Sequence, residues 1–222
     1  MSARHAFITG GGSGIGLATA RALAATGAKL TLAGRSFEKV RAAAEEFEFA
    51  HAVACDVANE TSVTTAFAAA RDRYGGIDIL INNAGQAPSA PFKRTTLELW
   101  NTVLAVNLTG AFLCTQAALP DMLDAKWGRI VNVGSVCSLK GYAYVSAYVA
   151  SKHGLLGLTR ALAQETAKLG VTVNCVCPGY VDTPIIAESV DRLTSKTSLT
   201  PEAAHASLIQ FNPQGRIITP EE

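Results

Sequence analysis

The chain is poor in charge and in long hydrophobic runs, and each shortage excludes a class of protein. Charged residues make up 17% of its 222 residues and the formal net charge is +1, so no basic or acidic surface indicates a nucleic acid or an anionic membrane. No apolar run approaches the roughly 18 residues of a spanning helix, and the N-terminus reaches glycines before a signal-peptide segment forms. These absences predict a cytoplasmic protein whose partners are small molecules.

Cysteine is scarce and its count is odd. The five cysteines have neither disulfide-framework nor zinc spacing and mostly lie in apolar segments: Cys55, Cys114, Cys137, Cys175 and Cys177. His51, His153 and His205 show no metal-ligand spacing, and Cys175-x-Cys177 lacks further ligands. The sequence therefore predicts reduced thiols and no metal site.

Short apolar or β-branched runs alternate with longer amphipathic, alanine-rich ones. The short runs predict strands at residues 5–9, 29–34, 51–57, 76–85, 128–135 and 171–179. The alternation is typical of βαβ units, so we expect an α/β fold with one doubly wound parallel sheet and helices on both faces. No repeat, linker or low-complexity segment is present, which predicts one domain over residues 1–222.

Two stretches show where helices begin and end. Asn59 is placed to cap a helix running from Glu60 to Tyr74, and Gly75-Gly76 is placed to stop it. After the sixth predicted strand the pattern loosens, and residues 180–211 predict one or two short helices. Ligands of open α/β sheets bind outside the carboxyl ends of strands, so this excursion is a candidate substrate lid.

The segment "FITGGGSGIGLATARALAATG" combines a strand, a glycine-rich turn and a helix that Gly27 is expected to end. Glycines allow a ligand to approach the backbone, and the free N–H groups of a helix start attract a pyrophosphate. The strict G-x-G-x-x-G spacing is absent, and a flexible turn without a ligand is the alternative. The segment instead reads Thr9-Gly10-x-x-x-Gly14-x-Gly16.

This loop resembles the nucleotide loop of the short-chain dehydrogenase/reductase family, and further landmarks agree with it in order and spacing. They are Asp56-Val57, Asn82-Asn83-Ala84-Gly85, Asn107, Ser135, Tyr148-x-x-x-Lys152 and Pro178-Gly179. The resemblance runs from about residue 5 to the end of the chain. It implies a Rossmann-like domain, a nicotinamide cofactor and a homo-oligomer, either a dimer or a tetramer.

The end of the second strand predicts which cofactor is preferred. A dinucleotide site normally carries a carboxylate about 20 residues beyond the glycines, which accepts hydrogen bonds from the adenosine ribose. Here Arg35 and Ser36 stand at that place, and a guanidinium suits a 2′-phosphate. The sequence favours NADP(H). The alternative is that NAD(H) is the preferred cofactor and the Arg35 side chain lies in solvent.

The resemblance implies further cofactor contacts. Asp56 is expected to receive the adenine amino group, with Val57 packed near the ring. The floor beneath the ribose and nicotinamide is implied to be Asn83, Ala84 and Gly85, although "NNAG" also suits a plain strand-ending turn. The remaining predicted contacts are Gly10, Ser13, Gly14, Ile15, Gly16, Pro178, Gly179, Val181 and Thr183.

Three tyrosines precede one lysine in "GYAYVSAYVASK", and the spacing selects among them. Alcohol–carbonyl chemistry needs a group that transfers a proton, and a tyrosine needs a nearby cation to stabilise its phenolate. Residues four apart share a helix face, so Tyr148 and Lys152 are expected to meet. Tyr144 lies eight residues before the lysine and Tyr142 ten, which predicts packing or pocket-wall roles for both.

The family resemblance implies a catalytic tetrad. Ser135 is expected to hydrogen-bond the reacting oxygen, Tyr148 to transfer the proton, and Lys152 to bind the nicotinamide ribose and lower the tyrosine pKa. Asn107 is expected to hold a water that links the lysine to solvent. The candidate substrate pocket comprises Gln86, Ser135, Val136, Cys137, Tyr142, Tyr148 and residues 185–211.

These residues together predict an oxidoreductase that moves a hydride between NADP(H) and a secondary alcohol or ketone. The tail "FNPQGRIITPEE" is weakly similar to relatives acting on 3-oxoacyl or 3-hydroxyacyl thioesters. A non-catalytic NADP-binding sensor or scaffold is the rival, which the presence of the whole tetrad disfavours. An extended-family dehydratase or epimerase usually needs a larger substrate domain.

The last residues of the sequence form a helix-opening signal. Thr219 suits an N-cap, Pro220 the first helical position, and Glu222 the third residue of a capping box. Family members usually continue by about one helix and a seventh parallel strand. We therefore expect either a shortened chain, which leaves the sixth strand as an exposed edge, or a missing tail that an unusual contact replaces.

Overall fold

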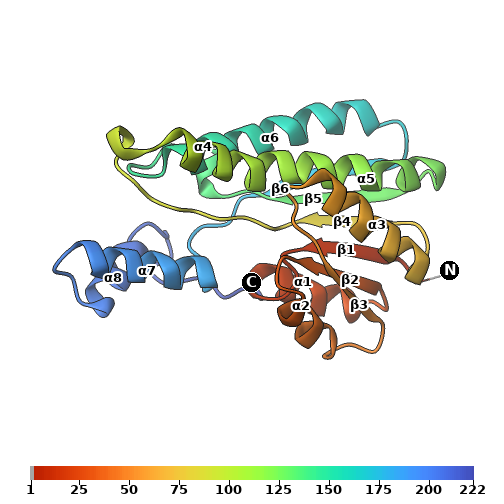
Figure 1. Cartoon of the computed structure of the whole chain (residues 1–222), viewed down its shortest axis with the longest axis horizontal. Coiled ribbons are helices and arrows are strands. Elements are labelled where there is room, and N and C mark those ends of the chain that lie inside the picture. The colour runs from red at the N-terminus through yellow and green to blue at the C-terminus, as the bar shows by residue number, and fades with distance from the viewer. Residues whose placement is uncertain (1–2) are drawn as a thin grey trace.

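The computed structural model describes residues 3–222, which contain a six-stranded sheet in the order β3-β2-β1-β4-β5-β6 (Figure 1). Every neighbouring pair is parallel. The strands are β1 (His5–Thr9), β2 (Lys29–Gly34), β3 (Ala50–Ala54), β4 (Ile79–Asn82), β5 (Gly128–Val133) and β6 (Val171–Val176). The chain winds outward from β1 in one direction and then outward from β4 in the other, so the predicted doubly wound fold is confirmed.

Helices cover both faces of the sheet. On one face lie α1 (Gly14–Ala24) and α2 (Phe37–Ala44), which pack on the side chains of one core cluster. The other face carries α3 (Glu60–Tyr74), α4 (Leu97–Leu104), α5 (Gly110–Asp124) and α6 (Ser146–Thr166). Figure 1 shows α4, α5 and α6 together on this second side. The strands β1 to β5 place side chains in both clusters, for example Phe7 in one and Ile8 in the other, whereas β6 contributes Val171 and Val173 to one cluster only.

Predicted helix boundaries are borne out at α3 and are late at α1. The Asn59 side chain accepts a hydrogen bond from the Ser62 N–H at 2.9 Å, and Gly75 ends α3 with φ +82°. The helix α1 ends at Ala24, whereas Gly27 lies three residues further on in a turn with φ +80°. That turn is where the chain reverses toward β2.

Four strands end earlier than predicted, because the residues that follow them leave the sheet. The strands β3, β4, β5 and β6 end at Ala54, Asn82, Val133 and Val176. The segments beyond these ends contain glycine, proline and asparagine, which suit turns. All four sets of loops open at the carboxyl edge of the parallel sheet.

One apolar helical stretch corrects the expectation drawn from hydropathy. The run Leu97–Asp124 joins α4, a π-helical turn (Ala105–Thr109) and α5, and is long and apolar enough to cross a membrane by length and composition. Its side chains Cys114, Ala118 and Met122 are fully buried in the core. By length and composition the chain therefore contains one such segment, contrary to the expectation, and its buried residues pack in the core against the sheet.

The segment after β6 forms two helices, as predicted for the lid: α7 (Pro184–Lys196) and α8 (Pro201–Ile209). Figure 1 shows this pair beyond the carboxyl edge of the sheet. The Asn212 side chain fastens its base, accepting from the Tyr180 N–H at 2.9 Å and donating to the Tyr180 carbonyl at 2.9 Å. Val181 then forms a single parallel bridge with Ile218.

The sixth strand is an edge of the sheet over the residues that the structure describes. Its residues Thr172, Asn174 and Val176 are exposed, while Val171 and Val173 are buried. At the end of the described chain the Thr219 N–H donates to Glu222 Oε2 at 2.9 Å, which is one half of the predicted capping box.

Candidate active site

The glycine loop leaves no room for side chains. Gly10 and Gly14 have φ values of +65° and +52°, which favour glycine. A Cβ on Gly16 would lie 2.4 Å from the Gly10 carbonyl oxygen and 2.6 Å from Asn83 Nδ2. Three of the predicted pyrophosphate glycines are thus held by backbone geometry or close contact, and the bare loop fits a dinucleotide phosphate.

The loop after β4 is joined to the glycine loop by Thr9 and Asn83. The Thr9 hydroxyl accepts from the N–H groups of Asn83 at 2.9 Å and Ala84 at 3.0 Å. The Asn83 amide in turn donates to the carbonyls of Thr9 and Gly10, at 3.0 and 3.2 Å. The "NNAG" segment is therefore more than a strand-ending turn, because it fixes the two predicted phosphate and ribose loops against each other.

Ser13 and Thr183 lie at the two sides of the start of α1. Ser13 is the N-cap residue, and its hydroxyl makes no capping hydrogen bond. The methyl of Thr183 stands 2.9 Å from where a Gly14 Cβ would be. A cavity of about 500 Å³ includes Gly14 and Thr183 in its lining but neither Ser135 nor Tyr148. Ile15 is half-buried against the α1–α2 core cluster, so its backbone rather than its side chain faces the loop.

The carboxyl end of β2 presents positive charge. Arg35 and Ser36 are both exposed, and Ser36 caps α2 without using its hydroxyl. Among residues 3–222 no carboxylate forms an ion pair with Arg35. Lys39, which sequence reasoning missed, lies beside the glycine loop, because a Gly12 Cβ would be 3.2 Å from Lys39 Cγ. Its place one helical turn after Ser36 was the available signal.

Asp56 and Val57 follow β3 at the same edge. Asp56 is exposed, and one of its carboxylate oxygens accepts from the Ala58 N–H at 3.0 Å. Val57 is 7% exposed and lines a small cavity together with Ala84 and Asn107. The predicted adenine residues therefore lie where the predicted ribose floor begins.

Asn107 and Lys152 meet at Gly85. A Cβ on Gly85 would lie 3.4 Å from Asn107 Oδ1 and 3.8 Å from Lys152 Nζ. Asn107 sits in the π-helical turn, 2% exposed, and pairs with both backbone groups of Gln86 at 2.9 Å. Its amide also donates to the hydroxyl of Ser151 at 3.1 Å, a contact that sequence reasoning missed. Ser151 in turn donates to the Tyr148 carbonyl at 2.7 Å.

Ser135 is held at the end of β5 by its own capping box. Its hydroxyl accepts from the Cys137 N–H at 3.1 Å, while its N–H donates to Ser138 Oγ at 3.2 Å. The next residue, Val136, donates its N–H to the Pro178 carbonyl at 2.9 Å. The serine is therefore fixed between the ends of β5 and β6 with its hydroxyl proton free for another acceptor.

Tyr148 and Lys152 share one face of α6, as the spacing predicts. The Lys152 ammonium lies 5.7 Å from the centroid of the Tyr148 ring and donates to the Val133 carbonyl at 2.7 Å. Burial lowers the pKa of Lys152 to about 8, and nearby thiols oppose part of that fall. Burial raises the pKa of Tyr148 to about 12, with the Ser135 hydroxyl acting in the opposite direction.

This tyrosine pKa differs from the sequence-based expectation. We expected Lys152 to lower it, but here desolvation is the largest influence and the lysine binds Val133 instead. At neutral pH Tyr148 is therefore a protonated phenol that can donate a proton. Lys152 is largely charged below pH 8.

The other two tyrosines lie outside α6, which begins at Ser146. Tyr144 has φ +68° and is 66% exposed, so it is neither a helical neighbour of Tyr148 nor a packing residue. The ring of Tyr142 meets the ring of Phe211 edge-on, with centroids 5.7 Å apart, and the ring of Tyr180 stacks on the same Phe211 ring, also with centroids 5.7 Å apart. The pocket-wall role predicted for Tyr142 fits this contact. For Tyr144 the exposure excludes the packing role, and the pocket-wall role stays a prediction.

The remaining predicted pocket residues differ in availability. The Gln86 amide donates to the Thr102 carbonyl at 3.3 Å, which engages it with α4 rather than leaving it in the pocket. Val136 is half-buried, and Cys137 is buried with its pKa raised by desolvation. Of these three, Val136 and Gln86 are partly exposed, and only Gln86 has its polar group engaged elsewhere.

The loop after β6 runs past the predicted nicotinamide position. Pro178 accepts from Val136, and a Cβ on Gly179 would lie 2.4 Å from Asn212 Oδ1. Val181 is 6% exposed, and its carbonyl accepts from the Thr183 hydroxyl at 3.2 Å. Asn212 was missed because nothing in its sequence neighbourhood indicates a partner 32 residues away.

The thiols and histidines form no metal centre. Over the described residues, no group of three or more histidine, cysteine or acidic side chains is arranged to hold a metal ion. Cys55, Cys114 and Cys137 are buried, as predicted. Cys175 and Cys177 are only half-buried, with their sulfurs 3.8 Å apart at the edge strand.

Comparison with known proteins decides the family. The model of the short chain dehydrogenase family matches residues 4–194. The chain belongs to this family. D-beta-hydroxybutyrate dehydrogenase of Cupriavidus necator is 39% identical, covering 100% of this chain and 88% of its own length. The monensin polyketide synthase putative ketoacyl reductase of Streptomyces virginiae is 41% identical, covering 100% and 87%.

A solved structure agrees in three dimensions. The crystal structure of an actinorhodin polyketide ketoreductase variant with NADPH has a TM-score of 0.94 and 36% identity, covering 99% of this chain and 86% of that one. The chain is thus an NAD(P)-dependent oxidoreductase of the short-chain family that interconverts a secondary alcohol and a carbonyl compound. The sensor or scaffold alternative is not favoured.

Proposed function

We propose that the protein is an NADP(H)-preferring reductase of 3-oxoacyl compounds. The observation that carries the cofactor preference is the end of β2, where Arg35 and Ser36 replace the usual carboxylate and Lys39 adds a second cation beside the glycine loop. The related ketoacyl reductase and beta-hydroxybutyrate dehydrogenase support the substrate class. The phosphate-binding role of Arg35 follows from its charge and paired donors.

The nicotinamide cofactor, when bound, supplies or receives the hydride. The residues proposed to hold it are those of the glycine loop, the β2 end, Asp56–Val57, Asn83–Gly85 and the segment from Pro178 to Thr183. They converge on the carboxyl edge of the sheet around the switch from β1 to β4, where ligands of doubly wound sheets bind.

The tetrad manages one proton. We assign Tyr148 as the acid in carbonyl reduction, because burial keeps it protonated at neutral pH. Ser135 has its hydroxyl proton available for the carbonyl oxygen, and the same hydroxyl lowers the pKa of Tyr148, which favours the phenolate left after transfer. Lys152, whose ammonium lies 5.7 Å from the centroid of the Tyr148 ring, is assigned to the nicotinamide ribose. Asn107 binds Gln86 and Ser151 and so fixes the helix start beside Tyr148.

The test is spectrophotometric. Purified protein is assayed with NADPH and with NADH against 3-oxoacyl thioesters, 3-oxo acids and simple ketones, and Arg35→Asp is measured in parallel. We expect faster NADPH oxidation by the wild type, and a shift of about 10- to 100-fold toward NADH in the variant, because a carboxylate repels the phosphate and accepts from a ribose hydroxyl. Equal affinity of the wild type for both cofactors would remove the proposed role of Arg35.

Two further properties belong to the proposal. We place the protein in the cytoplasm, on the basis of its composition and reduced thiols. We also propose a dimer or tetramer, as the family resemblance implies. Light scattering of the purified protein decides the oligomeric state, and a monodisperse monomer contradicts it.

A further inference from the structure

A chain of contacts surrounds the mouth of the candidate active site. The Ala90 N–H donates to the Tyr144 carbonyl at 2.8 Å, which joins the loop after β4 to the segment before α6. Tyr142 in that segment meets Phe211 at the end of α8. Tyr180 stacks on the same Phe211 ring, so the aromatic cluster of Tyr142, Tyr180 and Phe211 joins the lid to the segment before α6.

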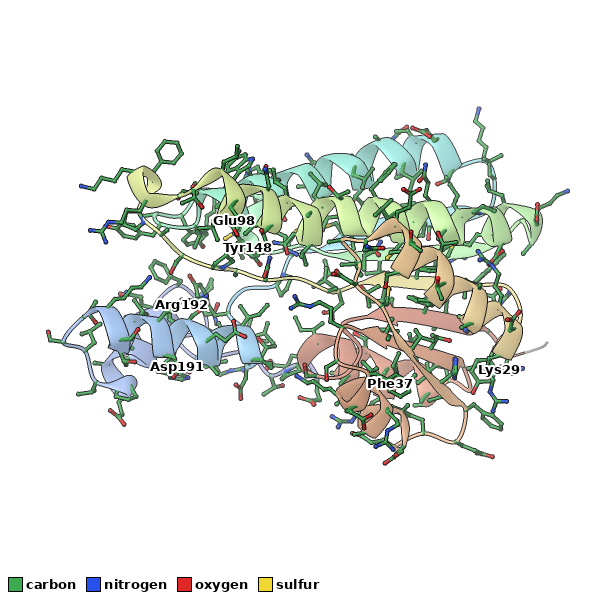
Figure 2. The ribbon with its side chains drawn as sticks, in the orientation of Figure 1. Lys29, Phe37, Glu98, Tyr148, Asp191 and Arg192 are labelled. Carbon is green, nitrogen blue, oxygen red and sulfur yellow. The ribbon has the colours of Figure 1, made fainter. Side chains whose placement is uncertain are left out.

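Arg192 completes the circuit from α7. Its Nη2 donates to the Ala87 carbonyl at 3.0 Å, across 105 residues of sequence, and to Ser189 Oγ at 3.2 Å. Ala87 directly follows Gln86, the residue whose backbone Asn107 holds. Figure 2 shows Arg192 on α7 toward the loop after β4 and the side of the molecule that carries Tyr148.

The charge of Arg192 has no counter-ion in the part of the chain that the structure describes. The side chain is half-buried, and none of the ion pairs among residues 3–222 includes it. Its Nε is buried without a hydrogen-bond partner in the same residues. A desolvated guanidinium with an unused donor is unfavourable unless an acceptor arrives.

Two further buried polar groups of residues 3–222 that lack a partner lie in the segment that leads into α6. Among the described residues, buried side-chain polar atoms without a partner are the Tyr142 hydroxyl, the Ser146 hydroxyl, Arg192 Nε and Asn82 Oδ1. Three of these four belong to the circuit or to the first residue of α6. Lys140 places its ammonium 5.2 Å from the centroid of the Tyr142 ring and adds positive charge. Buried polar groups are nearly always hydrogen-bonded, so Arg192 Nε is expected to find its acceptor on a ligand, and the charge of the guanidinium favours an anionic one.

We propose that Arg192 reads an oxygen anion of the substrate while Tyr148 handles the carbonyl. The anion is the carboxylate of a free oxo acid or a phosphate of a carrier thioester, since a guanidinium fork matches both. This inference rests on the proposed function, because it assigns the substrate of the same site. It makes Arg192, a lid residue outside the tetrad, the determinant of substrate charge.

The experiment compares substrates that differ in charge. Wild type, Arg192→Gln and Arg192→Lys are assayed with acetoacetate, with acetoacetyl coenzyme A and with neutral pentane-2,4-dione. We expect Arg192→Gln to raise KM for an anionic substrate by about 10- to 100-fold and to change KM for the dione less than about threefold. Arg192→Lys keeps the charge without the fork and lies between them. Lys196→Gln removes a charge from the same helix and is expected to match the wild type on every substrate.

The substrate arms identify the source of the anion. An increase in KM of Arg192→Gln for acetoacetate alone identifies the carboxylate as the group that Arg192 binds. An increase in KM for the coenzyme A ester alone identifies the phosphate. Equal increases for charged and neutral substrates mean that Arg192 only fastens α7 to Ala87, and they overturn the proposal. No increase on any substrate overturns it as well.

Calorimetry separates this inference from the proposed function. Acetoacetate and the coenzyme A ester are titrated into Tyr148→Phe saturated with NADPH, with and without Arg192→Gln. Loss of binding in the double variant supports the anion-reading role even if the wild type reduces neither compound, a result that would count only against the proposed function. Equal binding with and without Arg192, or binding of neither compound, overturns the inference.

Discussion

The carboxyl ends of the strands and the lid, which comprises α7 and α8, differ in how tightly their side chains are packed. At the sheet ends, Asn107, Ser135 and Lys152 are 2%, 8% and 4% exposed, and each is fixed by hydrogen bonds to neighbouring backbone. In the lid, only one residue of α7 and two of α8 are buried, namely Ile186, Ala204 and Leu208. The groups proposed to handle the proton thus sit in a well-packed frame, while the residues proposed to face a substrate sit on a thinly packed lid.

This difference in packing suggests that proton transfer and substrate selection depend on separate parts of the molecule. Proton transfer needs groups held within a fraction of an ångström, which burial and shared hydrogen bonds provide. Substrate choice needs fewer fixed groups, and we propose that side chains of the lid, such as Arg192 and Phe211, supply them. Changes at the sheet ends are therefore expected to affect turnover or stability strongly, and changes in the lid to affect KM.

The largest expected effect is on kcat, on substitution of Tyr148 at the carboxyl ends of the strands. Tyr148→Phe removes the proton donor and little else, so kcat should fall by about 10²- to 10⁴-fold while cofactor affinity stays near the wild-type value. Tyr144→Phe, at the exposed tyrosine before α6, is the matched control and should keep most activity. Steady-state kinetics with NADPH titration measure both. If the two variants behave the other way round, the assignment of the proton donor is wrong.

The next effect exposes the cost of burying Lys152. Its pKa is about 8 in the folded protein, below its usual 10.5, so the unfolded chain binds more protons between these values. The contribution of Lys152 to the free energy of unfolding is therefore lowest below pH 8 and rises as the pH approaches 10.5. Lys152→Met lacks this titration, so its stability relative to the wild type should fall by up to about 3 kcal/mol across the window.

Urea unfolding of both proteins without cofactor, between pH 7.5 and 10.5, makes this measurement. The raised pKa values of Tyr148 and the cysteines are common to the two proteins, so the difference isolates the lysine to a first approximation. A stability difference that stays constant with pH would show that Lys152 keeps its ordinary pKa and that the frame imposes no desolvation on it.

The smallest effect belongs to the lid. Phe211 is 45% exposed, so Phe211→Ala should cost under about 1.5 kcal/mol of stability while raising substrate KM several-fold through loss of its contacts with Tyr142 and Tyr180. Phe67→Ala is the control in the frame: this ring is fully buried and stacks on Phe7 at 4.0 Å, so its loss should cost about 3–5 kcal/mol. Equal losses on thermal unfolding would abolish the distinction between the two regions.

The sequence was informative where the chemistry is local. Alternating apolar runs predicted all six strands, Asn59 and Gly75 predicted the ends of α3, and the four-residue spacing placed Tyr148 and Lys152 on one face. Each of these depends on residues within one helix or strand. Patterns of this kind can be read from a single chain because their partners are neighbours in sequence.

It was less informative where the partner lies far along the chain. The expected fall in the Tyr148 pKa did not appear. Burial raises that pKa, and the Lys152 ammonium donates its hydrogen bond to the Val133 carbonyl, a partner that the four-residue spacing does not reveal. Ser151 and Asn212 were missed because their partners, Asn107 and Tyr180, lie far away in the sequence. Strand ends were placed too late, since nothing local shows where a buried run leaves the sheet for the site.

Asn212 has a consequence for how such a protein changes over evolutionary time. By binding both backbone groups of Tyr180 it closes a loop of 32 residues at its base, so the intervening helices lie between two points that stay together. The entropy of closing such a loop grows slowly, by about 0.6 kcal/mol for each doubling of its length. Insertions in the turn between α7 and α8 should therefore leave the folding of the sheet almost unaffected. Lids of other lengths and sequences can be exchanged at this clasp, and new substrates acquired, without redesigning the proton-transfer machinery.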